Sequence, residues 1–150
     1  MDNSDDNLDD NSANLKRTYY LNGQLKSEYF MVNGLREGPY KEYHLNGTLF
    51  MECEYINNLV CGNYKLYYSK NNKIYICCHY VNGIKDGKET YYHDDDKGDK
   101  FFEYVWSNGI LIDKYMISDG VPVHYTNNNN YDFDFDGLQL SDEAEDEPEE

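Results

Sequence analysis

A unit of about two dozen residues recurs along the middle of this chain. Tyr19–Tyr40 (YYLNGQLKSEYFMVNGLREGPY) aligns with Tyr43–Tyr64 (YHLNGTLFMECEYINNLVCGNY) at an offset of 24 residues. Further copies run over Tyr67–Glu89, Tyr92–Tyr115 and, as a half-unit, Tyr115–Tyr125. Internal repeats of this length indicate stacked units that each contact only their neighbours. The repeat therefore predicts an extended array rather than a globular enzyme fold.

The first turn of the early units is marked by an asparagine followed by a glycine. Asn22-Gly23 and Asn46-Gly47 stand between runs of alternating side chains. Asn-Gly is typical of the two-residue type I′ turn, because both central residues of that turn need a positive φ. Each unit is therefore expected to form one β-hairpin closed by a type I′ turn.

A second turn in each unit connects one hairpin to the next. Asn33–Gly38 has counterparts at residues 57–62 and 82–87. In the fourth unit the Asn-Gly pair is kept, but Asp113 stands where the other units have their last glycine. We expect this turn to differ from the others.

The second strands of the hairpins carry largely apolar residues at every other position. Because alternate residues of a strand share one side of a sheet, these positions form an apolar face. The sequence predicts an all-β fold over residues 15–125, an elongated single-layer antiparallel meander of four hairpins and a terminal half-unit. Its predicted partner-binding residues are Leu49, Met51, Tyr55, Ile74, Ile76, Tyr80, Phe102 and Trp106.

Charge is concentrated at the two ends of the chain. Residues 1–14 hold five acidic residues and residues 126–150 hold ten, with no Lys or Arg in either segment. The middle carries 14 acidic and 13 basic residues, a net charge of −1. Both ends are expected to be disordered acidic tails. In the second tail, YDFDFDGLQL alternates aromatic and acidic residues, which is typical of segments that dock on basic or apolar partners; a solubilising tail is the alternative.

Composition also excludes several kinds of partner. No apolar run approaches the roughly 20 residues of a membrane span, and the Asp-rich start is unlike a signal peptide. We expect an intracellular, cytoplasmic protein. The near-neutral body lacks the basic stripe that nucleic acid needs, and the same lack of basic clusters argues against an anionic lipid surface.

No catalytic, cofactor or metal site is predicted. His44 and His93 follow tyrosines that recur in every unit, so they are interpreted as repeat positions. The turn HDDDKGDK at 93–100 has consecutive acids with lysines among them, unlike a calcium loop with ligands at alternate positions.

The four cysteines, Cys53, Cys61, Cys77 and Cys78, form no CxxC pair and are expected to be reduced strand residues. Equivalent positions in neighbouring hairpins place Cys53 and Cys78 two strands apart, about 10 Å. That separation is too long for a disulfide.

The turn glycines and tyrosines resemble those of the MORN repeat. The resemblance covers about residues 19–125 and is carried by Tyr19, Asn22, Gly23, Asn33, Gly34, Gly38, Tyr40 and Tyr43 with their counterparts. It is closest to the divergent form in bacterial proteins described as antitoxin components of toxin–antitoxin systems. The chain departs from the pattern where Asn58 replaces a glycine and Glu89 replaces a tyrosine. The Asn- and Tyr-rich composition suggests an AT-rich genome, as in large DNA viruses of amoebae.

The resemblance implies an elongated sheet that serves as a scaffold for protein contacts, with lipid contacts or dimerisation in some members. A single layer leaves an apolar face that the polar tails cannot cover, and exposed apolar surface of that size marks interaction sites. We therefore expect a non-catalytic scaffold whose apolar face binds a protein or a second copy of the chain. The alternative is an antitoxin-like neutraliser of a basic enzyme.

Overall fold

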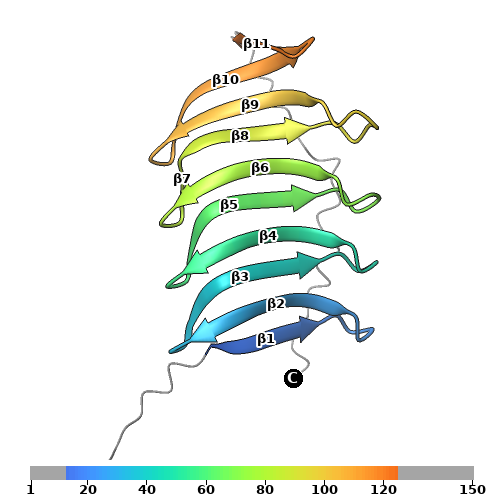
Figure 1. The fold of residues 1–150 in the computed structure, drawn as a ribbon, viewed down its shortest axis with the longest axis vertical. Helices are drawn as coiled ribbons and strands as arrows, with labels where there is room; N and C mark the ends of the chain where they lie inside the picture. The colour runs from blue at the N-terminus through green and yellow to red at the C-terminus, as the bar shows by residue number, and fades with distance from the viewer. Residues whose placement is uncertain (1–12, 125–150) are drawn as a thin grey trace, which may run out of the picture.

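The computed structural model describes residues 13–124, which form one antiparallel sheet and no helix (Figure 1). The predicted acidic tails lie outside these residues, apart from Ala13 and Asn14. The strands are β1 (Asn14–Tyr19), β2 (Leu25–Val32), β3 (Leu35–Tyr43), β4 (Leu49–Ile56), β5 (Leu59–Tyr67), β6 (Ile74–Val81), β7 (Ile84–Lys85), β8 (Gly87–Tyr92), β9 (Lys100–Ser107), β10 (Ile110–Ser118) and β11 (Val121–His124).

Neighbours in the sheet are neighbours in the chain. The strands pair in sequence order from β1 to β11, with the short β7 pairing with β6 beside β8. Figure 1 shows this meander as a single curved layer, with β1 and β11 at its two ends. The predicted fold class, an open antiparallel meander of repeated hairpins, is confirmed.

The turns that link one hairpin to the next are the type I′ turns. Asn33 and Gly34 have φ of 49° and 78°, and Asn82 and Gly83 have φ of 50° and 78°. Asn57 and Asn58 form the same turn, with φ of 51° and 68°. Asn58 thus adopts the left-handed conformation that a glycine adopts in the other units.

The prediction of type I′ turns at Asn22-Gly23 and Asn46-Gly47 is wrong. Only the glycine is left-handed there: Gly23 has a φ of 85°, and its N–H donates to Tyr20 O at 2.8 Å. The side chain of Asn22 instead accepts a hydrogen bond from the N–H of Gln24 at 3.0 Å. These are three-residue loops, a turn followed by a left-handed glycine, which Asn-Gly also suits.

A β-bulge follows each of these first turns. Glu42 pairs with Met51 while Tyr43 pairs with Leu49, which leaves Phe50 as an extra residue. The same shift leaves Tyr75 extra in β6 and Phe101 extra in β9. Directly paired residues lie on the same side of the sheet. The residues that precede the bulge in a strand therefore lie on the side opposite to the one that simple alternation predicts.

The turn at Asp113 differs from its counterparts, as predicted. In the first hairpin connection the register moves from Met31↔Arg36 to Tyr29↔Tyr40, which places three residues opposite one around the left-handed Gly38. In the fourth, Leu111↔Trp106 is followed by Asp113↔Val105, a shift of only one residue.

The last strand ends the sheet with a proline. Pro122 lies opposite Ile117, one pair beyond the type I′ turn that joins β10 to β11. Ser118 and Val121, which flank the turn, form a hydrogen-bonded pair. In the next pair, Ile117 and Pro122, the backbone N positions point away from the partner strand. Pro122 therefore stands where its missing N–H costs the sheet no internal hydrogen bond.

Candidate protein-binding face

Pairing across the strands defines the two faces of the sheet. The aromatic face, as we name it, consists of two rows. One row is Ser27, Glu42, Met51, Leu66, Ile76, Tyr91, Phe102 and Met116. The other is Tyr29, Tyr40, Cys53, Tyr64, Cys78, Glu89, Tyr104 and Lys114. The opposite, charged face carries the row Glu28, Lys41, Glu52, Lys65, Cys77, Thr90, Glu103 and Tyr115.

The structure brings most of the predicted binding residues together on the aromatic face. Met51, Ile76 and Phe102 lie in its first row. Tyr55 contacts Tyr40, with ring centroids 5.5 Å apart, and Tyr80 contacts Tyr64 at 5.6 Å. Trp106 completes the set, because its indole N–H donates to Glu89 at 2.7 Å.

Leu49 and Ile74 are not part of this face. Leu49 pairs with Tyr43, and the hydroxyl of Tyr43 donates to Glu28 on the charged face at 2.9 Å. Ile74 pairs with Tyr67, whose hydroxyl donates to Glu52 at 2.7 Å. Both residues precede the bulge in their strand, so simple alternation assigned them to the wrong side.

The aromatic face gains residues that sequence alternation missed. Tyr75 contacts Tyr91 at 5.9 Å between ring centroids, and Phe101 contacts Tyr91 at 6.1 Å. Tyr75, Tyr91 and Phe102 are the buried centre of the sheet, with exposed fractions of 7%, 9% and 9%. The signal available in the sequence was the recurrence of a bulky residue at 50, 75 and 101, one place before the expected column.

An arginine lies on three tyrosine rings at the N-terminal end of this face. The Arg36 guanidinium is 5.3 Å from the Tyr29 ring, 5.7 Å from Tyr40 and 5.3 Å from Tyr55. Tyr29 and Tyr40 are themselves stacked at 5.7 Å. We call this group the arginine platform. Burial raises the pKa of Tyr40 to about 12, so its ring faces the arginine as a neutral phenol.

A lysine occupies the matching place near the other end of the face. Lys85 lies 5.0 Å from the Trp106 ring and donates to Glu89 at 2.7 Å. Glu89 is only 3% exposed, and its other oxygen accepts the indole N–H of Trp106. A buried carboxylate needs such partners, because an unpaired charge away from water is strongly unfavourable. Glu89 therefore holds the cation and the indole in one network.

On the charged face the charges compensate one another across the strands. Lys65 pairs with Glu52 at 2.8 Å, and Lys88 pairs with Glu103 at 2.6 Å. The Lys65 and Tyr67 hydrogen bonds lower the pKa of Glu52. This face is a ladder of cross-strand ion pairs, the usual arrangement of a solvated sheet surface.

His44, at the first turn of the second unit, stands where the first and third units have a tyrosine. Tyr20 donates to the carbonyl of Tyr43 at 2.7 Å and Tyr68 to that of Tyr92 at 2.8 Å, each linking one hairpin to the next. His44 stands at the equivalent position and lies 3.4 Å from the Tyr67 carbonyl. These side chains make the same kind of contact between successive hairpins.

The cysteines are free thiols. Burial raises the pKa of Cys53 to about 11 and that of Cys78 to about 12. Since the thiolate is the reactive form, both are poor nucleophiles at neutral pH.

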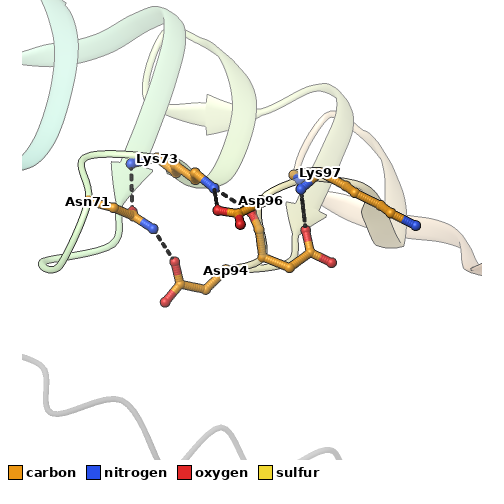
Figure 2. Close-up of polar contacts among 7 residues, drawn as sticks. Asn71, Lys73, Asp94, Asp96 and Lys97 are labelled. Atoms are coloured by element: carbon orange, nitrogen blue, oxygen red, sulfur yellow. Dashed lines mark hydrogen bonds and ion pairs between the residues drawn. The ribbon is translucent and has the colours of Figure 1, made fainter.

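The acidic turn is held by neighbouring turns rather than arranged as a cage (Figure 2). Asn71 donates to Asp94 and Lys73 pairs with Asp96 at 3.6 Å, while the carboxylate of Asp95 accepts the N–H groups of Lys97 and Gly98. Among the described residues, no group of three or more His, Cys, Asp or Glu is placed to hold a metal ion.

A second apolar strip lies beside the type I′ turns, on the side opposite Tyr80. Leu59 and Ile84 are 47% and 50% exposed. Each lies against the glycine of the following turn: a β-carbon on Gly109 would come within 2.9 Å of Ile84 Cγ2. Because these glycines are needed for space as well as for φ, we interpret this aliphatic rim as packing between successive turns.

The fold is that of a repeat protein, and comparison with known families agrees. Residues 15–33 and 36–57 match the MORN repeat variant. The first match covers nearly all of β1 and all of β2, and the second nearly all of β3 and all of β4. These matches support a MORN-repeat protein, a family that is generally non-catalytic. They carry no information about an antitoxin role or the source of the chain. No curated protein matches the chain.

Within the described part of the chain, no helix is long and apolar enough to cross a bilayer.

Proposed function

We propose that this protein is a non-catalytic scaffold that binds a protein partner, or a second copy of itself, through the aromatic face. The observation that carries the proposal is the arginine platform. In this platform an arginine contacts three partly exposed tyrosine rings. Arginine and tyrosine are among the residue types most enriched at the hot spots of protein interfaces. The charged face lacks this property, because its cations Arg17, Lys65 and Lys88 pair with carboxylates of the neighbouring strands rather than lying on aromatic rings.

The repeat array is proposed to span residues 15–125, with an acidic tail on each side. The strands of the third and fourth hairpins continue the geometry of the family-matched segments without interruption. Each hairpin adds two strands to the same face, so the face is as long as the array.

A test can compare two adjacent residues that point to opposite sides of β6. A photo-reactive benzoylphenylalanine replaces Tyr80 on the aromatic face or His79 on the charged face, and a third variant carries it at Ile84 on the aliphatic rim. We expect Tyr80→benzoylphenylalanine alone to cross-link one defined protein in host extract, or to give a dimer of the purified chain. Cross-linking from position 79 or 84 instead, or from none of the three, would contradict the proposal.

A neutraliser of a basic enzyme is the second candidate, favoured by the net charge of −16. In that case the captured protein is basic, and its binding weakens steeply as salt is added.

A further inference from the structure

The aromatic face carries a cation, Arg36, that lies on aromatic rings and pairs with no carboxylate of the described residues. Among the ion pairs of residues 13–124, none includes Arg36, and its side chain donates no hydrogen bond to a described residue. An arginine has five N–H donors in a planar fork that fits a carboxylate. The three tyrosine rings fix the guanidinium in place while leaving those donors open to a ligand.

The chain leaves the sheet beside uncovered apolar surface of the same face. Met116 pairs with Phe102 on one side and Val123 on the other, so all three lie on the aromatic face. Met116 is 43% exposed and Val123 is 52% exposed. The last described residue, His124, directly follows Val123. The next 26 residues, 125–150, therefore begin next to exposed apolar side chains.

The composition of that segment matches what the face offers. In an extended segment, Tyr131, Phe133 and Phe135 share one side. The first acidic residues after Asp136 are Asp142 and Glu143. In an extended segment Asp132, Asp134 and Asp136 lie on the side opposite these aromatic residues, and the adjacent carboxylates of Asp142 and Glu143 come farther along the chain.

The spacing of the two groups also fits. Met116 lies on β10 and Arg36 on β3, six strand positions apart, or about 29 Å at roughly 4.8 Å per strand. Asp142 follows Phe133 by nine positions, which span about 30 Å when extended. The same segment therefore reaches the apolar patch and the arginine together.

We propose that residues 131–143 lie across the aromatic face of their own sheet, from Met116 to Arg36. The aromatic residues cover the exposed apolar side chains of β10 and β11, and the carboxylates bind the guanidinium. The segment acts as an intramolecular cover. Its regulatory consequence, that a partner must displace the segment to reach the face, rests on the proposed function; the docking itself does not.

The test uses the full chain without any partner, so its outcome is independent of the scaffold proposal. Phe133→benzoylphenylalanine is irradiated at low concentration, and the cross-linked peptides of the monomer are mapped by mass spectrometry. We expect the cross-links to fall on the aromatic face, around Met116 and Phe102. Cross-links on the charged face, or none within the monomer, would overturn the proposal. A dominant dimer band would assign the face to a second copy and overturn it as well.

Charge variants test the arginine contact separately. Asp142→Asn with Glu143→Gln should lower the cross-link yield roughly threefold, as expected for an exposed ion pair worth about 0.7 kcal/mol. The matched control, Glu149→Gln with Glu150→Gln, removes the same charge beyond the reach of the contact and should leave the yield unchanged. The four positions lie outside residues 13–124, so the changes alter no side chain of the described sheet. Equal effects of the two pairs would overturn the contact with Arg36.

A second pair of variants tests the same contact from the sheet. Arg36→Gln should match the effect of the Asp142 and Glu143 changes, whereas Lys41→Gln, on the charged face of the same strand, should not. Circular dichroism checks that both variants remain folded. A yield unchanged by Arg36→Gln in the folded protein would exclude the arginine as the docking point.

Discussion

The first and third hairpin connections place a cation at the same position of the repeat and treat it in opposite ways. Arg36 lies on Tyr29, Tyr40 and Tyr55 with no described carboxylate paired to it. At the matching position Lys85 meets a buried carboxylate, because Glu89 stands where the first two units have Tyr40 and Tyr64. The repeat thus fixes where a side chain points but not what it binds. Near one end of the face the cation Lys85 is paired with Glu89, whereas at the other end Arg36 remains available to a ligand.

Burial follows the same division. Three large aromatic side chains are buried in β6, β8 and β9, whereas β2 and β4 bury only Ser27 and Cys53. Substitutions at equivalent positions should therefore cost more in the C-terminal half than in the N-terminal half.

Alkaline pH should have the largest effect, because it acts on both halves at once. Burial raises the pKa of Tyr40 and Tyr75 to about 12 from 10.0, and raises that of Tyr91 further. A tyrosine with a raised pKa holds its proton more tightly in the folded state, so its stabilisation is complete below pH 10 and is lost as the pH rises through about 12. We expect the urea midpoint to fall over this range, together with the appearance of phenolate absorbance. A fall that is complete below pH 10 would show that other groups control unfolding.

Phe102→Ala should destabilise the sheet more than the change at the equivalent position of the second hairpin. Phe102 is buried against Tyr91 and Tyr104, so its loss leaves a cavity and should cost about 3 kcal/mol. Met51→Ala removes a side chain that is only partly buried, and should cost roughly half as much. Urea unfolding of the two variants measures the difference. Equal losses would mean that the two halves are packed alike.

Glu89→Ala should have a smaller but specific effect. Lys85 and the Trp106 indole both lose their acceptor, at a cost of about 2 kcal/mol, below the range for a wholly buried pair because Lys85 is partly exposed. The double variant Lys85→Val with Glu89→Tyr reproduces the Val60 and Tyr64 combination of the second hairpin and should recover most of the loss. Failure to recover would show that the substitutions are not coupled.

The sequence was sufficient for the topology because its turns are local. Asn-Gly pairs place left-handed residues where the chain reverses, mid-strand glycines such as Gly38 place them at register shifts, and Asp113 marked the one connection that changes. The same information placed Met51, Tyr55, Ile76, Tyr80, Phe102 and Trp106 on one face.

What the sequence did not predict follows from the bulges. Asn-Gly suits both a two-residue and a three-residue loop, and the two differ by one residue in register. That single residue moves Leu49 and Ile74 to the charged face and brings Tyr75 and Phe101 to the aromatic face. The role of Glu89 was hidden for another reason: it depends on a lysine and a tryptophan that only strand pairing brings together.

Pro122 gives the array a defined end. A strand docking on the outer side of β11 would find one of its hydrogen-bond donors missing at that residue. Pairing of β11 with an edge strand of another molecule is thereby disfavoured, and with it the end-to-end growth of sheets into fibres.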